Sequence, residues 1–156
     1  MNLNEIPWGG SGIERCLYNF IVEKFPKGTK MLELGAGVIS TQVFSHHFEL
    51  TTIEQMSEWC WKYPSNYIHA PLLGEWYDPQ YLQNLPKDYE VVLVDGPSGD
   101  KRHGLLNHLE LFNTDALWIF HDIYRPTERN LAINFANMTN KKIEFYEGCD
   151  YWASVK

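Results

Sequence analysis

Apolar residues follow two alternating patterns along the chain, one typical of amphipathic helices and the other of buried strands. Helical spacing predicts helices in residues 11–25, 39–48, 56–63, 79–85, 105–112 and 127–138. Apolar or β-branched runs predict strands in residues 30–34, 50–54, 66–70, 89–95, 115–122, 141–148 and 150–156. Ser11 and Glu14 have the spacing of a capping box before the first helix, and Pro26 and Gly28 end it.

This order of elements predicts an α/β protein with one central sheet. Strands separated by helices form a parallel sheet with helices on both faces. The last two strands are joined by a tight turn around Gly148, so one of them runs antiparallel to the other. We therefore predict a single Rossmann-like, doubly wound sheet of seven strands, mostly parallel, with the last strand antiparallel. The 156 residues form one domain, with a leading helical segment in 1–28 and the core in 29–156.

Composition narrows the partners and the compartment that we expect. The net charge is −7 without a basic block, which argues against a nucleic-acid surface and favours a neutral or cationic small molecule. We expect no association with a membrane, because no apolar stretch is long enough to span one and the first residues lack signal-peptide features. Cys16, Cys60 and Cys149 are widely spaced, and we interpret them as reduced thiols of a cytoplasmic protein.

The turn after the first predicted strand, ELGAG, is the strongest candidate for a ligand site. Gly35 and Gly37 permit positive φ and close approach of a ligand, at the sheet edge where open α/β proteins bind ligands. The third glycine of the dinucleotide fingerprint is missing. Glu33 would oppose a pyrophosphate but favour the ammonium and sulfonium groups of S-adenosylmethionine (SAM). Glu54 ends the second strand and can accept hydrogen bonds from the ribose of NAD or SAM.

ELGAG followed by TTIE resembles motif I and the acidic second-strand motif of the class I SAM-dependent methyltransferases. The order of elements resembles that family's fold over nearly the whole chain. The resemblance implies SAM as the cofactor. It also implies three groups of cofactor-binding residues, which are Glu33, Gly35, Ala36 and Gly37 at the methionine part, Glu54 and Gln55 at the ribose, and His69 and Ala70 at the adenine.

Two later strands also end in ionisable residues. Asp95 follows residues 91–94, and His121 and Asp122 follow residues 117–120. A buried strand does not place ionisable groups at its edge without a use for them, so we expect these side chains in the same cleft. VDGPSG, Arg102 and TDALWIFHDIYRPTE resemble the corresponding run of the polysaccharide O-methyltransferases that modify glucuronoxylan.

The predicted reaction is transfer of a methyl group to an oxygen atom of a small molecule or glycan. His121 or Asp122 is the base that removes the acceptor proton, and Asp95 orients the acceptor or the SAM amine. Asp95 and Asp122, with or without His121, are alternatively ligands of a divalent cation. Arg102 or Arg125 pairs with the acceptor if that acceptor is anionic.

Other functions fit the same pattern. One alternative is a SAM-binding module without catalysis. The second is another nucleoside-cofactor enzyme, such as an NAD-linked oxidoreductase or an aminopropyl transferase. The third is a subunit that needs a partner to be active. The core fold uses nearly all of the length, so we expect the acceptor cleft to be shallow, or to be completed by the N-terminal segment or by a second subunit in a homodimer.

Overall fold

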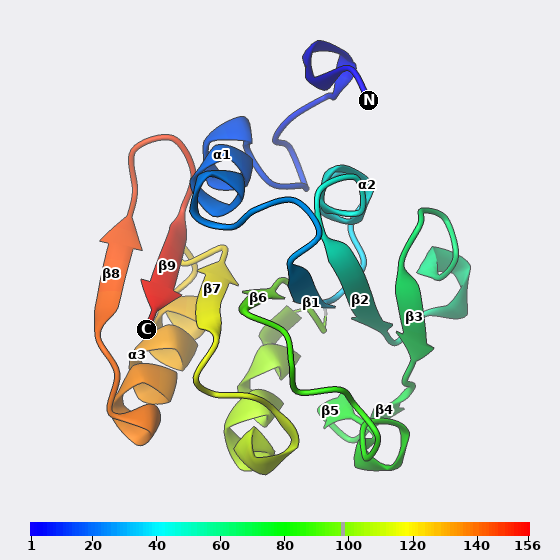
Figure 1. Ribbon diagram of the computed structural model, residues 1–156. Helices are drawn as coiled ribbons and strands as arrows, with labels where there is room; N and C mark the ends of the chain where they lie inside the picture. Colours follow the sequence, from blue (N-terminus) through cyan, green and yellow to red (C-terminus); the bar gives the residue numbers. More distant parts are fainter. Residues whose placement is uncertain (98) are drawn as a thin grey trace.

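A seven-stranded sheet runs through the middle of the molecule (Figure 1). The computed structural model describes residues 1–97 and 99–156, so Ser98 of the VDGPSG motif lies outside the described residues. The strand order is β3-β2-β1-β6-β7-β9-β8. Neighbours pair in parallel from β3 to β7, and β9 is antiparallel to both β7 and β8. The predicted fold class is confirmed.

The strands are short and mostly buried. Their bounds are Lys30–Leu34 for β1, Glu49–Glu54 for β2, Asn66–His69 for β3, Val91–Val94 for β6, Leu117–His121 for β7, Ile143–Tyr146 for β8 and Trp152–Val155 for β9. A separate hairpin, which the sequence pattern did not predict, consists of β4 at Leu72–Leu73 and β5 at Trp76–Tyr77.

Helices cover both faces of the sheet (Figure 1). One face carries α1 at Arg15–Lys24 and α2 at Ser40–Phe44. The other face carries α3 at Pro126–Thr139 and the 3-10 helix η4 at Gly99–Asn107. The remaining elements are single 3-10 turns, which are η1 at Leu3–Glu5, η2 at Ser57–Trp59, η3 at Pro79–Tyr81 and η5 at Leu109–Leu111.

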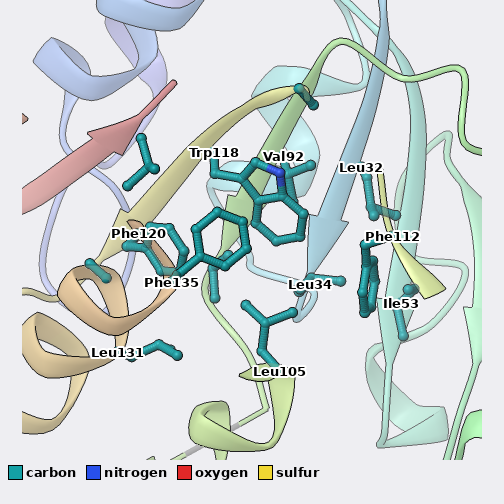
Figure 2. Packing of buried hydrophobic residues seen from close by; sticks show 14 of the residues in the cluster. Leu32, Leu34, Ile53, Val92, Leu105, Phe112, Trp118, Phe120, Leu131 and Phe135 are labelled. Atoms are coloured by element: carbon teal, nitrogen blue, oxygen red, sulfur yellow. The ribbon is translucent and has the colours of Figure 1, made fainter. Parts of the chain in front are cut away.

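Alternation along each strand sends successive side chains to opposite layers. In β1, Met31 packs on the α1/α2 side, whereas Leu32 and Leu34 pack on the α3 side. On the α3 side, the rings of Trp118, Phe120 and Phe135 pack together, as Figure 2 shows. Aromatic residues make up 15% of the chain, and part of them form this core.

Four predicted helices differ from the observed ones. The 56–63 and 79–85 segments contain only the three-residue 3-10 turns η2 and η3. The helix predicted at 11–25 begins at Arg15, because Gly9 and Gly12 form a turn closed by a 3.1 Å backbone hydrogen bond before it. The 105–112 segment forms 3-10 turns instead of an α-helix. Gly104 packs so closely on Trp76 that a Cβ atom would lie 2.5 Å from the Trp76 Cβ, and this contact constrains the path of the segment.

The prediction of three reduced thiols is wrong for Cys16 and Cys149, which form a disulfide across 133 residues of sequence. The first residues of α1 lie beside the turn between β8 and β9, and this proximity brings the two sulfur atoms together. Sequence spacing carries no information about such a contact. Cys60 is a buried free thiol. No helix within the described residues combines the length and apolar character needed to cross a membrane.

Candidate functional site

The carboxyl ends of β1, β2, β6 and β7 border a cleft of about 710 Å³. This volume is in the usual range for a small-molecule or cofactor site. Residues of the N-terminal segment between Pro7 and Gly12 also line the cleft. The sheet edge identified from the sequence is therefore hollowed, and a segment from outside the sheet forms part of its wall.

The glycine turn after β1 touches the loop after β6. Gly35 has φ +90°, and a Cβ atom on it would lie 2.7 Å from the backbone nitrogen of Gly96. A Cβ atom on Gly96 would lie 2.5 Å from the Gly35 Cα atom. Only glycine fits both positions, so the two loops approach each other at backbone distance. Gly35, Ala36 and Gly37 all line the cleft.

Glu33 does not line the cleft, contrary to the prediction. Strand alternation turns its side chain towards α2, where it is fully buried. Its carboxylate accepts hydrogen bonds from the hydroxyls of Ser40 at 2.6 Å, Thr41 at 2.7 Å and Thr52 at 3.0 Å. Burial raises the pKa of Glu33 to about 7, although these hydroxyls act in the opposite direction. Thr41 also accepts the Gly37 N–H at 2.9 Å. Glu33 therefore stabilises the glycine turn through Thr41, without lining the cleft itself.

Glu54 lines the cleft and holds two of its loops together. One carboxylate oxygen accepts the Ala36 N–H at 2.8 Å, and the other accepts the Met56 N–H at 2.7 Å. Each carboxylate oxygen has a second lone pair, which remains available to a ligand hydroxyl. Gln55 also lines the cleft.

His69 and Ala70 do not line the cleft, although the resemblance implies that they flank adenine. The His69 ring lies 3.2 Å from the backbone oxygen of Gln55, and Ala70 is fully buried. Met56, Trp59 and Pro97 line the cleft instead. Met56 and Trp59 belong to the ring-rich run MSEWCWKY, which is the sequence signal for this wall.

Arg102 is a buried bridge between the ends of β6 and β7. Its guanidinium lies 3.1 Å from Asp95 and 3.2 Å from Asp122, and it also donates to the Asp95 carbonyl at 2.7 Å. Its charge is therefore directed at protein carboxylates. Arg125 lies at the rim, with its side chain 41% exposed and 3.3 Å from Asp122. Of the two arginines, Arg125 is the more accessible to an acceptor.

His121 lies beneath the cleft and is not one of the residues that line it. Its Nδ1 is 3.2 Å from Asp95 Oδ1 and 3.6 Å from Asp122 Oδ1, and its Nε2 is 3.3 Å from Asp150 Oδ1. Burial acts to lower the pKa of His121. Hydrogen bonds to Asp150 and Asp95 and the charges of Asp95 and Asp122 outweigh burial and raise this pKa to about 10. Both ring nitrogens donate in the resulting imidazolium.

Asp122 lines the cleft and has a left-handed backbone conformation, with φ +63°. A non-glycine residue in this region is uncommon and marks a position where the surrounding structure holds the backbone. Asp95 also lines the cleft. Its contacts with Arg102 and His121 both use Oδ1, so Oδ2 is available to a ligand.

Asp95, His121 and Asp122 form a candidate metal-binding group, since one ligand atom from each lies within 4.8 Å of the others. The surrounding charges do not suit a divalent cation. Arg102 and Arg125 already face the carboxylates. A metal ion would have to displace the buried Arg102 guanidinium from both carboxylates, so these residues do not fit a metal.

Comparison with known proteins identifies the fold. The sequence matches no family model and no curated protein. A candidate caffeoyl-CoA O-methyltransferase from Staphylococcus aureus matches 99% of this chain and 87% of its own, with 16% identity and a TM-score of 0.64. Precorrin-6y C5,15-methyltransferase from Geobacter metallireducens matches 100% of this chain and 96% of its own, with 12% identity and a TM-score of 0.64.

A third solved structure contains the cofactor. Fibrillarin from Aeropyrum pernix, with natively bound SAM, matches 90% of this chain and 73% of its own, with 13% identity and a TM-score of 0.55. Identities this low establish the shared fold alone. The narrower resemblance to glucuronoxylan O-methyltransferases stays a prediction.

Proposed function

We propose that this chain, which has the fold of the class I SAM-dependent methyltransferases, binds SAM in its cleft and methylates an oxygen atom of a small molecule or glycan. The observation that carries the proposal is the meeting of three features in one cleft. These are the glycine turn after β1, the Glu54 carboxylate after β2 and the acidic ends of β6 and β7.

The cleft walls match the chemical groups of SAM. The close contact of Gly35 with Gly96 leaves backbone, without side chains, facing the methionine part. Asp95 presents Oδ2 to the ammonium group, and Glu54 accepts from the ribose hydroxyls. Trp59, with Met56 and Pro97, provides the apolar wall that suits adenine.

The acceptor proton passes to Asp122 in this proposal. Bound SAM supplies an electrophilic methyl group on its sulfonium, so the protein mainly positions the acceptor oxygen and removes its proton. Asp122 faces the cleft and is held by Arg102 and Arg125. His121 is a poorer candidate for the base, because it is buried and both of its ring nitrogens already donate to carboxylates. Catalysis proceeds without a metal ion.

The test is methyl transfer from labelled SAM to a panel of phenols, sugars and uronates by the Asp122→Asn variant. Turnover should fall roughly 100-fold or more, the usual contribution of a general base. The dissociation constant of SAM should stay within about threefold of the wild-type value, since Asp122 acts on the acceptor.

The control is Asp115→Asn, which removes an equal charge from an exposed residue paired with Lys141. This variant should keep wild-type turnover. Full turnover in Asp122→Asn would remove Asp122 as the base. SAM binding by the wild type without transfer to any acceptor in the panel would favour the alternative of a non-catalytic SAM-binding module.

A further inference from the structure

Asp150, in the turn between β8 and β9, connects two parts of the site from outside the cleft. Its Oδ1 lies 3.3 Å from His121 Nε2, and its Oδ2 accepts the Glu14 N–H at 3.1 Å. Glu14 is the N-cap residue of α1, directly after the N-terminal segment that lines the cleft. Cys149, the residue before Asp150, is bonded to Cys16 in the first turn of α1.

The His121 ring is placed between carboxylates on both of its nitrogen-bearing edges. Asp95 and Asp122 face Nδ1, and Asp150 faces Nε2. A neutral imidazole carries one N–H, so its other nitrogen would direct a lone pair at a carboxylate oxygen. Only the protonated ring donates on both sides. The geometry therefore selects the charged form of His121.

Charged groups of both signs surround the ring. The carboxylates of Asp95, Asp122 and Asp150 face it from the ends of β6 and β7 and from the β8–β9 turn. The cations that face the same carboxylates are Arg102, on η4, and Arg125, at the start of α3. With His121 protonated, these six residues hold three positive and three negative charges, and the buried Glu128, 3.8 Å from Arg125, adds a further negative charge. Removal of the ring proton would increase the excess of negative charge in a mostly buried cluster.

The pKa values agree with the geometry. Hydrogen bonds to Asp150 and Asp95 raise the pKa of His121 to about 10 against the effect of burial. Burial acts to raise the pKa of Asp150. The hydrogen bond from His121 and its charge, with the N–H groups of Glu14 and Tyr151, outweigh burial, and the pKa of Asp150 is lowered.

We propose that Asp150 is a positioning residue that keeps His121 protonated, so that His121 can hold the Asp95 carboxylate in the orientation that receives SAM. The last step rests on the proposed function, because it assigns Asp95 to the SAM ammonium group. Asp150 itself touches neither cofactor nor acceptor. Its effect reaches the cleft through one ring and two hydrogen bonds.

Between pH 6 and pH 9, the proposal makes the contribution of His121 to SAM binding independent of pH in the wild type and dependent on pH when Asp150 loses its charge. In Asp150→Asn the amide oxygen can still accept a hydrogen bond, but the negative charge is gone. The pKa of His121 then falls towards its ordinary value of about 6.5. Above that pH the ring loses a donor, and Asp95 loses one of its two cationic partners.

The experiment combines two measurements on the full chain between pH 6 and pH 9. The first is an NMR titration of the His121 ring, with its signals assigned by their loss in His121→Gln. The second is calorimetric titration with SAM in Asp150→Asn and in the control Asp115→Asn. The dissociation constant of Asp150→Asn is divided by that of Asp115→Asn at each pH. This ratio cancels the titration of the ligand's own amino group.

The expected results separate positioning from a merely structural role. His121 should stay protonated throughout in the wild type and titrate within the range in Asp150→Asn. The ratio of dissociation constants should rise about tenfold from pH 6 to pH 9. Asp150→Glu, which restores the charge, should bring His121 back to the protonated form. A structural role would lower the melting temperature of Asp150→Asn without a change of the ratio with pH.

Two results would overturn the proposal. One is a wild-type His121 that titrates near pH 6.5, a measurement that needs no variant to fold. The other is a constant ratio of dissociation constants although the pKa of His121 has fallen in Asp150→Asn. If the wild type does not bind SAM at any pH, the proposed function fails instead. The NMR titration then still decides whether Asp150 keeps His121 protonated.

Discussion

The contact between Gly35 and Gly96 shows how single residues set the shape of the cleft. Gly35 combines a left-handed backbone with a distance that leaves no space for a methyl group. The two loops that it joins carry Ala36 and Asp95, which both line the cleft. A change at Gly35 should therefore act on ligand binding as well as on stability.

The Gly35→Ala substitution should weaken SAM binding by about tenfold or more, the equivalent of roughly 1.4 kcal/mol. The added methyl group would separate the loops after β1 and β6. Gly28→Ala is a matched control, because Gly28 has the same φ of +90° but open space where its Cβ would stand. Both variants should lose about 1–2 kcal/mol of stability from backbone strain. Calorimetry with SAM distinguishes them, and equal affinities would contradict this role of Gly35.

Residues at strand ends could be predicted from the sequence, whereas the directions of their side chains could not. Gly35, Glu54, Asp95 and Asp122 were placed at the cleft by the rule that ligands bind at the carboxyl ends of strands. Glu33 was not placed correctly, because the motif does not reveal that strand alternation turns it towards α2.

Asp150 has no sequence signal of its own. Its role depends on the β8–β9 turn lying against both His121 and Glu14, and this contact joins residues that are 136 positions apart. Arg102 is similar, since nothing in the sequence shows that its charge is directed at Asp95 and Asp122 instead of at a ligand.

At the scale of the elements, a disulfide bond holds α1 against the β8–β9 turn. The Cys16–Cys149 disulfide and the Asp150–Glu14 hydrogen bond join the same two segments. The N-terminal segment before α1 forms part of the cleft wall. The prediction of a cytoplasmic protein rested in part on reduced thiols, and the disulfide removes that support.

Replacement of both cysteines by serine should lower the free energy of unfolding by about 2–5 kcal/mol, the usual cost of losing a native disulfide. The same variant should bind SAM more weakly, because residues 7–12 would no longer be held to the sheet by this bond. Thermal melting with and without a dithiol reductant is the measurement.

The free thiol supplies the control for this experiment. A Cys60→Ala variant keeps the disulfide, so the reductant should lower its melting temperature by as much as it lowers that of the wild type. The reductant should have no effect on the double serine variant. An unchanged wild-type melting temperature in the reductant would contradict a stabilising role of the disulfide.

The strands were easier to predict than the helices. Every strand of the main sheet had been expected near its observed position. The buried parallel strands β6 and β7 give the clearest signal, because such strands are continuous apolar runs. The short 3-10 segments were harder, since their paths depend on tertiary contacts such as that of Gly104 with Trp76. The hairpin of β4 and β5 has only two residues in each strand, too few for a pattern.

At the scale of the whole molecule, the sheet order explains why distant residues share one site. After β3 the chain crosses back to form β6 beside β1, which places the turns after β1 and β6 side by side at the middle of the sheet. That position is the switch in strand order, where open α/β proteins bind their ligands. The nature of the acceptor and a homodimer remain predictions, because neither follows from the fold.

The central claim is that this cleft takes a positively charged nucleoside donor. Calorimetric titration of the wild-type protein with SAM, S-adenosylhomocysteine and NAD tests it most directly. We expect one binding site for SAM and for S-adenosylhomocysteine, with dissociation constants in roughly the micromolar range and NAD at least about tenfold weaker. Tighter binding of NAD, or no heat from either SAM or its demethylated product at millimolar concentration, would contradict the account.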